Sequence, residues 1–159
     1  MESIDARKTG WKYQALSQSQ AGVRVFTASY ILISIQDPDL PEIDLDEPAN
    51  CRGILRMRFD DIDHPASGQT LFSRDDAAEI LDFVQEHAHD VSVIACHCKM
   101  GMCRSPAVIG ALSMLMTGDA SVLKDRRGKA KYRPNRHIYN TMMQIGRSHA
   151  ISRQNRMTE

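Results

Sequence analysis

The chain has 159 residues, of which 42% are hydrophobic and 25% are charged. This composition is typical of a soluble globular protein, and the length suits one domain with a sizeable core. Twenty basic side chains balance twenty acidic ones, so the chain as a whole has no attraction to nucleic acid or to an anionic membrane. The polar first twenty residues are unlike a secretory signal peptide, and no apolar run reaches the length of a membrane span. We expect a single domain over residues 1–159, with flexibility confined to its N-terminal segment and its C-terminal tail.

The first half of the chain contains three segments that we predict as strands and one that we predict as a helix. The strands are residues 23–26, 31–35 and 53–59, and the short helix is residues 13–19. The segment 31–35 is a continuous apolar run, which is typical of a strand buried on both faces. The acidic, proline-containing stretch 37–48 ends this run and predicts a surface loop.

The second half of the chain alternates helices with one strand. The predicted elements are a helix over 73–84, a strand over 91–95, a helix over 105–117 and a last helix with inner positions Ile138, Met142 and Ile145. Ser73 and Asp76 form a capping-box pattern, Gly118 is a helix-ending residue, and Asn135 can cap the last helix. Strands that alternate with helices predict an α/β fold, with a central, mostly parallel sheet flanked by helices.

A short polar loop separates the strand at 91–95 from the helix at 105–117. Cys98 and Arg104 bracket five residues, giving the spacing C-x5-R, with Gly101 at the middle and Ser105 directly after. A short loop that ends at a helix N-terminus directs successive backbone N–H groups inward, and the helix adds partial positive charge. Arg104 can bind two oxygens of one anion through its planar pair of donors. The loop is therefore predicted to bind a phosphate-sized oxyanion, and the same positive field favours the nucleophilic thiolate of Cys98.

The string His97-Cys98-x-x-Gly101-x-x-Arg104-Ser105 resembles the signature loop of the protein tyrosine phosphatase superfamily, in its cysteine-dependent, dual-specificity branch of bacterial type. The resemblance implies the phosphatase fold and the hydrolysis of phosphomonoesters, foremost phosphotyrosine, phosphoserine or phosphothreonine in proteins, without a cofactor or metal ion. It implies that Cys98 forms a cysteinyl-phosphate, Arg104 binds phosphate oxygens, Ser105 donates a hydrogen bond to the sulfur, and His97 orients the loop.

The departing oxygen of a phosphomonoester needs a proton, and a carboxylic acid on a neighbouring loop is the natural donor. The stretch Phe59-Asp60-Asp61-Ile62-Asp63 offers three candidates. In the resembling families, the donor lies in strings such as F-D-D that are followed soon by proline. Matched in this way, Asp61 is the donor, Asp63 is the second choice and Asp60 is the third.

The remaining loop residues are predicted to contact the substrate. They are Lys99, Met100, Gly101, Met102 and Cys103, which line the pocket together with Arg104. Cys96 and Cys103 have two interpretations, because a thiol beside a reactive thiolate either forms a protective disulfide with Cys98 after oxidation or is an inert small residue. A reactive thiolate needs a reducing compartment, so we expect a cytoplasmic protein.

A basic segment follows the helix at 105–117. Residues 124–136 contain seven Lys or Arg and one acid, Asp125. This segment is either a solvated surface loop or part of the substrate approach, where it would contact an anionic lipid head group or RNA.

Three other functions use the same residues. The loop could hold a phosphorylated partner without turnover, or the enzyme could act on phosphoinositides or RNA 5′ phosphates rather than on proteins. A metal site built from Cys96, His97, Cys98 and Cys103 is disfavoured, because adjacent ligands do not readily converge in a tetrahedron.

Overall fold

The computed structural model describes residues 10–23 and 26–152. The strands are β1 (Lys12–Ser17), β2 (Tyr30–Gln36), β3 (Cys51–Arg58) and β4 (Val93–Cys98). The helices are α1 (Gln18–Val23), α2 (Arg74–His87), α3 (Arg104–Thr117) and α4 (Arg136–Gly146), with short 3-10 turns η1 (Ala88–Asp90) and η2 (Ser121–Leu123). Within these ranges, no helix is long and apolar enough to cross a membrane.

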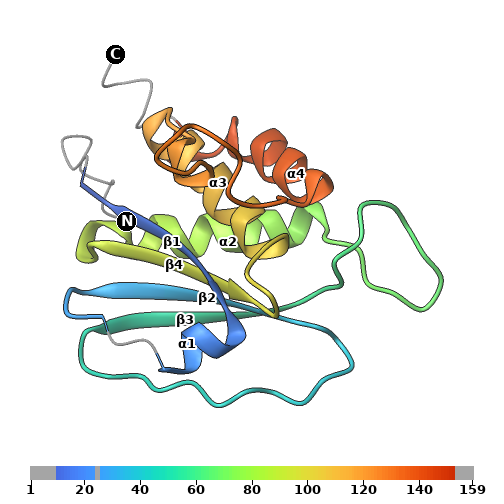
Figure 1. Cartoon of the computed structure of the whole chain (residues 1–159), viewed down its shortest axis with the longest axis horizontal. Helices are drawn as coiled ribbons and strands as arrows, with labels where there is room; N and C mark the ends of the chain where they lie inside the picture. The colour runs from blue at the N-terminus through green and yellow to red at the C-terminus, as the bar shows by residue number, and fades with distance from the viewer. Residues whose placement is uncertain (1–9, 24–25, 153–159) are drawn as a thin grey trace.

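The four strands form one sheet in the order β1-β4-β2-β3, and every neighbouring pair is parallel. The four arrows accordingly run in the same direction, with α2, α3 and α4 on one face of the sheet and α1 on the other (Figure 1). This arrangement confirms the α/β class with a parallel sheet between helices. The carboxyl ends of all four strands meet at one edge, which is where open α/β sheets place their ligands.

Alternation along the strands divides the apolar side chains between two clusters. Ile31, Ile33 and Ile35 of β2 face the three larger helices, whereas Tyr30 and Leu32 face the side of α1. The two central strands, β2 and β4, are buried along their whole length. Burial on both faces explains the continuous apolar run that identified β2 in the sequence.

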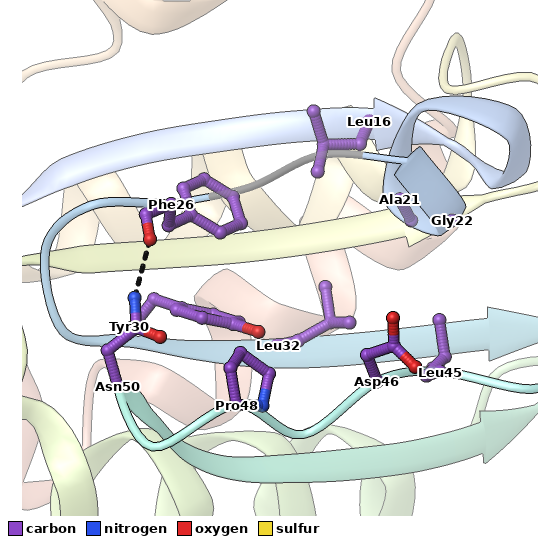
Figure 2. Close-up of a pocket in the computed structure, with 10 residues that line it drawn as sticks. All are labelled: Leu16, Ala21, Gly22, Phe26, Tyr30, Leu32, Leu45, Asp46, Pro48 and Asn50. Atoms are coloured by element: carbon purple, nitrogen blue, oxygen red, sulfur yellow. Dashed lines mark hydrogen bonds between the residues drawn. The ribbon is translucent and has the colours of Figure 1, made fainter.

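The smaller cluster on the α1 face surrounds a pocket of about 190 Å³ (Figure 2). Phe26 and Tyr30 lie on one side of this pocket, with their ring centroids 4.5 Å apart, and the loop before β3 closes it. The Asn50 Nδ2 donates to the Phe26 carbonyl oxygen at 2.6 Å. Burial raises the pKa of Tyr30 to about 12, so its phenol stays neutral.

Three helix boundaries confirm the sequence predictions. Ser73 and Asp76 form a reciprocal capping box at the start of α2. Gly118 ends α3 in the left-handed conformation, with φ of 75°. Asn135 caps α4, because its side chain accepts a hydrogen bond from the Ile138 backbone N–H at 3.0 Å.

The prediction for the N-terminal region is wrong. Residues 12–17 form strand β1 rather than a helix, and the helix α1 begins only at Gln18. The alternating pattern of Lys12–Ser17 places Tyr13 and Ala15 against the main core and Leu16 against the smaller one, so pairing with β4 decides the conformation. The expected strand over 23–26 is also wrong at both described positions, because Val23 ends α1 and Phe26 lies in the loop before β2; residues 24–25 lie outside the described residues.

Candidate active site

The C-x5-R loop (residues 98–104) connects the carboxyl end of β4 to the first residue of α3. Gly101 has a φ of 71°, in the left-handed region that favours glycine. A Cβ atom at Gly101 would lie 2.6 Å from the Ser17 backbone nitrogen and 2.8 Å from the Leu16 carbonyl carbon. The middle of the loop therefore packs directly on the end of β1, and only glycine allows this approach.

The Cys98 sulfur lies at the base of this loop, surrounded by hydrogen-bond groups. It accepts from the Gly101 backbone N–H at 3.3 Å and from the Ser105 backbone N–H at 3.4 Å. The Ser105 Oγ lies 3.3 Å from the sulfur and an equal distance from the Leu16 carbonyl oxygen, so its single proton can reach either acceptor. Two backbone N–H groups and one hydroxyl thus converge on this sulfur at the N-terminus of α3.

Arg104 is buried, and its guanidinium group is oriented by residues from two other strand ends. Its Nη1 donates to the Asp37 Oδ1 at 2.6 Å and to the Phe59 carbonyl oxygen at 2.9 Å. Asp37 directly follows β2, and Phe59 directly follows β3. Both of these contacts use Nη1. The Nε and Nη2 groups make no hydrogen bond within the described part of the chain, so they remain available for an anion.

His97 points to the opposite face of β4 from Cys98, as strand alternation requires. Its Nε2 lies 2.6 Å from the Ser34 Oγ, across the β2–β4 pair. Burial lowers the pKa of His97 to about 4, so the imidazole is neutral at pH 7. His97 therefore ties the end of β4 to the neighbouring strand and does not contact the sulfur through its ring.

The acid loop (residues 60–65) follows β3 at the same edge of the sheet. The Asp61 Oδ1 accepts a hydrogen bond from the Asn135 Nδ2 at 2.9 Å, and the same amide donates to the Ile62 carbonyl oxygen at 3.0 Å. The backbone N–H of Asn135 donates to the Cys103 carbonyl oxygen at 2.9 Å. Asn135 thus joins the acid loop, the C-x5-R loop and the start of α4.

The other two carboxylates of the acid loop have different partners. The Asp60 Oδ2 accepts from the Thr70 backbone N–H at 2.7 Å, which closes a turn within the connection to α2. The Asp63 side chain is 67% exposed, and its Oδ1 lies 2.6 Å from the His64 Nδ1. The hydrogen bond with His64 lowers the pKa of Asp63, which favours the form without a proton to donate. Asp61 is the carboxylate whose contacts lead to the C-x5-R loop.

The two additional cysteines near the loop differ in position. Cys96 is fully buried on the same face of β4 as Cys98, and burial raises the pKa of its thiol well above the ordinary value. Partial burial and the neighbouring Asp61 carboxylate raise the pKa of Cys103. A raised thiol pKa lowers nucleophilicity at neutral pH. All four cysteines are free, and no group of three or more metal-ligating side chains occurs in residues 10–23 and 26–152.

The outer residues of the C-x5-R loop are open to solvent. Lys99 is exposed, and Met100 and Met102 are 71% and 39% exposed. The basic segment (residues 124–136) reaches this loop at its far end, where the Arg133 backbone N–H donates to the Met102 carbonyl oxygen at 2.9 Å.

Three contributors to the site could not be read from the sequence. Asp37 was predicted only to end a strand, Asn135 only to cap a helix, and Ser34 was not singled out. Asp37 lies 67 residues from Arg104, and Asn135 lies 74 residues from Asp61. The available signal was topological, because in a parallel sheet the residues directly after each strand share one edge.

No protein-family model and no curated protein sequence matches the chain. Among solved structures, the chain is similar to the crystal structure of Tk-PTP in the active form, with a TM-score of 0.50 and 19% sequence identity. The similarity covers 77% of this chain and 80% of that one. At this level of identity, the likeness establishes the fold, and it agrees with the phosphatase fold that the C-x5-R string implies.

Proposed function

We propose that the chain is a cysteine-dependent phosphatase of the dual-specificity type, which hydrolyses phosphotyrosine, phosphoserine or phosphothreonine in proteins. The observation that carries this proposal is the set of three polar contacts around the Cys98 sulfur, two from backbone N–H groups and one with the Ser105 hydroxyl, at 3.3–3.4 Å. They lie beside a guanidinium group that is held by two partners. Such a site is suited to binding a tetrahedral anion in the loop, in contact with a nucleophilic sulfur.

In the first step, the Cys98 thiolate attacks phosphorus, forming an S–P bond while the bond to the departing oxygen breaks. Asp61 donates its proton to that oxygen, and the alcohol or phenol leaves neutral. The N–H groups of the C-x5-R loop and the free nitrogens of Arg104 bind the non-bridging oxygens, whose charge increases in the transition state.

In the second step, water attacks phosphorus and the S–P bond breaks. The Asp61 carboxylate accepts the proton of the water, and inorganic phosphate is released. The electron pair returns to Cys98, where the Ser105 hydroxyl can donate a hydrogen bond to the departing sulfur. This cycle restores both groups and uses no cofactor or metal ion. Because the proposed nucleophile is a thiolate, which needs a reducing compartment, the proposal includes a cytoplasmic location for the protein.

The test is turnover of p-nitrophenyl phosphate by the wild type and by Cys98→Ser. We expect the substitution to lower kcat by at least about 10⁴-fold, as for other enzymes that lose their nucleophile. Cys51→Ser, the same change at a half-buried cysteine on β3, serves as the matched control and should keep turnover within twofold of wild type.

The alternatives predict different results in the same assay. Thermal stabilisation by phosphate without turnover in the wild type would instead support a phosphate-binding module. Faster hydrolysis of a phosphoinositide or an RNA 5′ phosphate than of phosphopeptides would support the proposed chemistry but change the substrate class from proteins to lipids or RNA.

A further inference from the structure

An open groove runs along the free side of β1 and ends at the C-x5-R loop. We call it the β1 groove, and its volume is about 620 Å³. All six residues of Lys12–Ser17 line it, the segment Met100–Met102 closes one end, and Val122, Lys131 and Tyr132 form the opposite wall. Strand β1 is the outer strand of the described sheet beside β4 (Figure 1). The groove therefore has a strand edge along its length and the candidate active site at its end.

The backbone of β1 presents unused hydrogen-bonding groups to this groove. The Lys12 N–H donates to the Ser92 carbonyl oxygen at 2.8 Å, which sets the register of the β1–β4 pair. Alternate residues of a parallel strand bond to the same neighbour, so Tyr13 and Ala15 direct their N–H and C=O groups away from β4. These groups make no hydrogen bond to another described residue. An unpaired strand edge is a template for an added extended segment.

The side chains of the β1 groove favour an acidic partner. Its lining contains Lys12 and Lys131 and no Asp or Glu. The Lys131 Nζ lies 5.4 Å from the centre of the Tyr132 ring, and both residues face the groove. Near the C-x5-R loop, the exposed Met100 and Met102 provide an apolar surface.

The groove wall and the C-x5-R loop are physically connected. The Arg133 backbone N–H binds the Met102 carbonyl oxygen, one residue after the Lys131–Tyr132 wall. Gly101 packs on the end of β1 at the other side. A chain lying along β1 would therefore be held in a fixed position relative to Cys98. Because β1 has six residues and an extended partner has the same rise of about 3.3 Å per residue, the strand can pair with a segment of similar length.

Building on the proposed phosphatase function, we propose that the β1 groove binds an extended acidic segment of the phosphorylated protein substrate. The segment adds as a strand beside β1 while its phosphorylated residue enters the C-x5-R loop. Backbone hydrogen bonds to Tyr13 and Ala15 provide affinity, and Lys12 and Lys131 select acidic sequences.

The first experiment measures binding of a fluorescent phosphopeptide to the Cys98→Ser protein, which does not require turnover. A peptide with acidic residues beside the phosphorylated residue should bind at least tenfold more tightly than one in which lysines replace them. The double substitution Lys12→Glu/Lys131→Glu should remove this preference. Lys124→Glu/Lys129→Glu, the same charge change outside the groove lining, should alter the affinity less than twofold.

The second experiment tests strand addition without changing the protein. N-methylation of the acidic peptide, one residue at a time, removes single N–H donors. Strand pairing predicts that methylation weakens binding severalfold at every second residue and has little effect at the residues between. Loss at every position, at none, or without a two-residue period would overturn the proposed geometry.

The outcomes separate this inference from the proposed function. Turnover of p-nitrophenyl phosphate together with equal binding of the acidic and basic peptides keeps the phosphatase and rejects the docking site. Tight, periodic binding of the acidic peptide without any turnover rejects the phosphatase and keeps the docking site. Tighter binding of a 5′-phosphorylated RNA, lost in Lys12→Glu/Lys131→Glu, would overturn the protein-substrate assignment. Peptide binding that competes with self-association of the chain would assign the edge to a second copy instead.

Discussion

The C-x5-R loop and the acid loop lie at the same edge of the sheet but are held in different ways. The C-x5-R loop is fixed by β4 and α3 at its two ends and by the contact of Gly101 with the backbone of β1. The acid loop is exposed, and Asp61 is held by one amide side chain, that of Asn135. The proposed nucleophile, Cys98, is thus positioned mainly by backbone and the proposed proton donor, Asp61, by a side chain, so substitutions should affect the two proposed roles separately.

The largest effect after loss of Cys98 is expected at Arg104. Arg104→Lys keeps the positive charge but cannot satisfy Asp37 and Phe59 while also presenting two donors to phosphate. We expect kcat/KM for p-nitrophenyl phosphate to fall about 10³-fold. Arg52→Lys, at an exposed ion pair with Asp90, is the control and should be close to wild type. Near-normal turnover by Arg104→Lys would show that the oriented guanidinium is dispensable.

The next largest effect is expected at Asp61. Asp61→Asn should lower kcat about 10²-fold for phosphotyrosine, whose phenol needs a proton to depart, and less for p-nitrophenyl phosphate, whose phenolate leaves readily. Asp63→Asn and Asp60→Asn are the matched controls. A larger loss in Asp63→Asn than in Asp61→Asn would shift the proton donor by two residues along the acid loop.

A smaller effect of the same kind is expected at Asn135. Asn135→Ser keeps a side chain that can cap α4 but cannot donate to both Asp61 and Ile62. The free energy of unfolding should change by less than about 1 kcal/mol, while kcat for phosphotyrosine falls about tenfold. Urea unfolding and steady-state kinetics measure the two quantities. Equal losses for phosphotyrosine and p-nitrophenyl phosphate would contradict a role of Asn135 in proton donation to the departing oxygen.

The last prediction concerns stability at acidic pH rather than activity. The folded-state pKa of His97, about 4, lies below its ordinary value of 6.5, so the unfolded chain binds more protons between these values. The contribution of neutral His97 is fully present above pH 6.5 and is lost as the pH falls toward 4, on the order of 3 kcal/mol. Urea unfolding at several pH values should show a steeper dependence for wild type than for His97→Gln. The same pH dependence of the unfolding free energy in the two proteins would contradict the lowered pKa of His97 in the folded state.

The sequence predicted the parts of the fold that are encoded locally. The C-x5-R loop, the capping box of α2 and the cap of α4 depend on residues within a few positions of one another. The prediction of a helix at β1 is wrong because the strand has only six residues, several of them polar, and its partner β4 lies about 80 residues further along the chain.

The residues that orient the candidate site also lie far from it in the sequence. Asp37 and Asn135 are ordinary turn and cap residues in the sequence, and their contacts with Arg104 and Asp61 arise only when the strand ends meet. Local patterns therefore predict the candidate reactive groups, but not the groups that orient them.

The most direct test of this account is acid-quench mass spectrometry of the Asp61→Asn protein during turnover of p-nitrophenyl phosphate. Loss of the group that activates water should let the intermediate accumulate. We predict one phosphoryl group per chain, attached to the peptide that contains Cys98 and absent from Cys98→Ser. A phosphoryl group on another residue, or turnover without a phosphorylated protein, would contradict the role of Cys98 as the nucleophile.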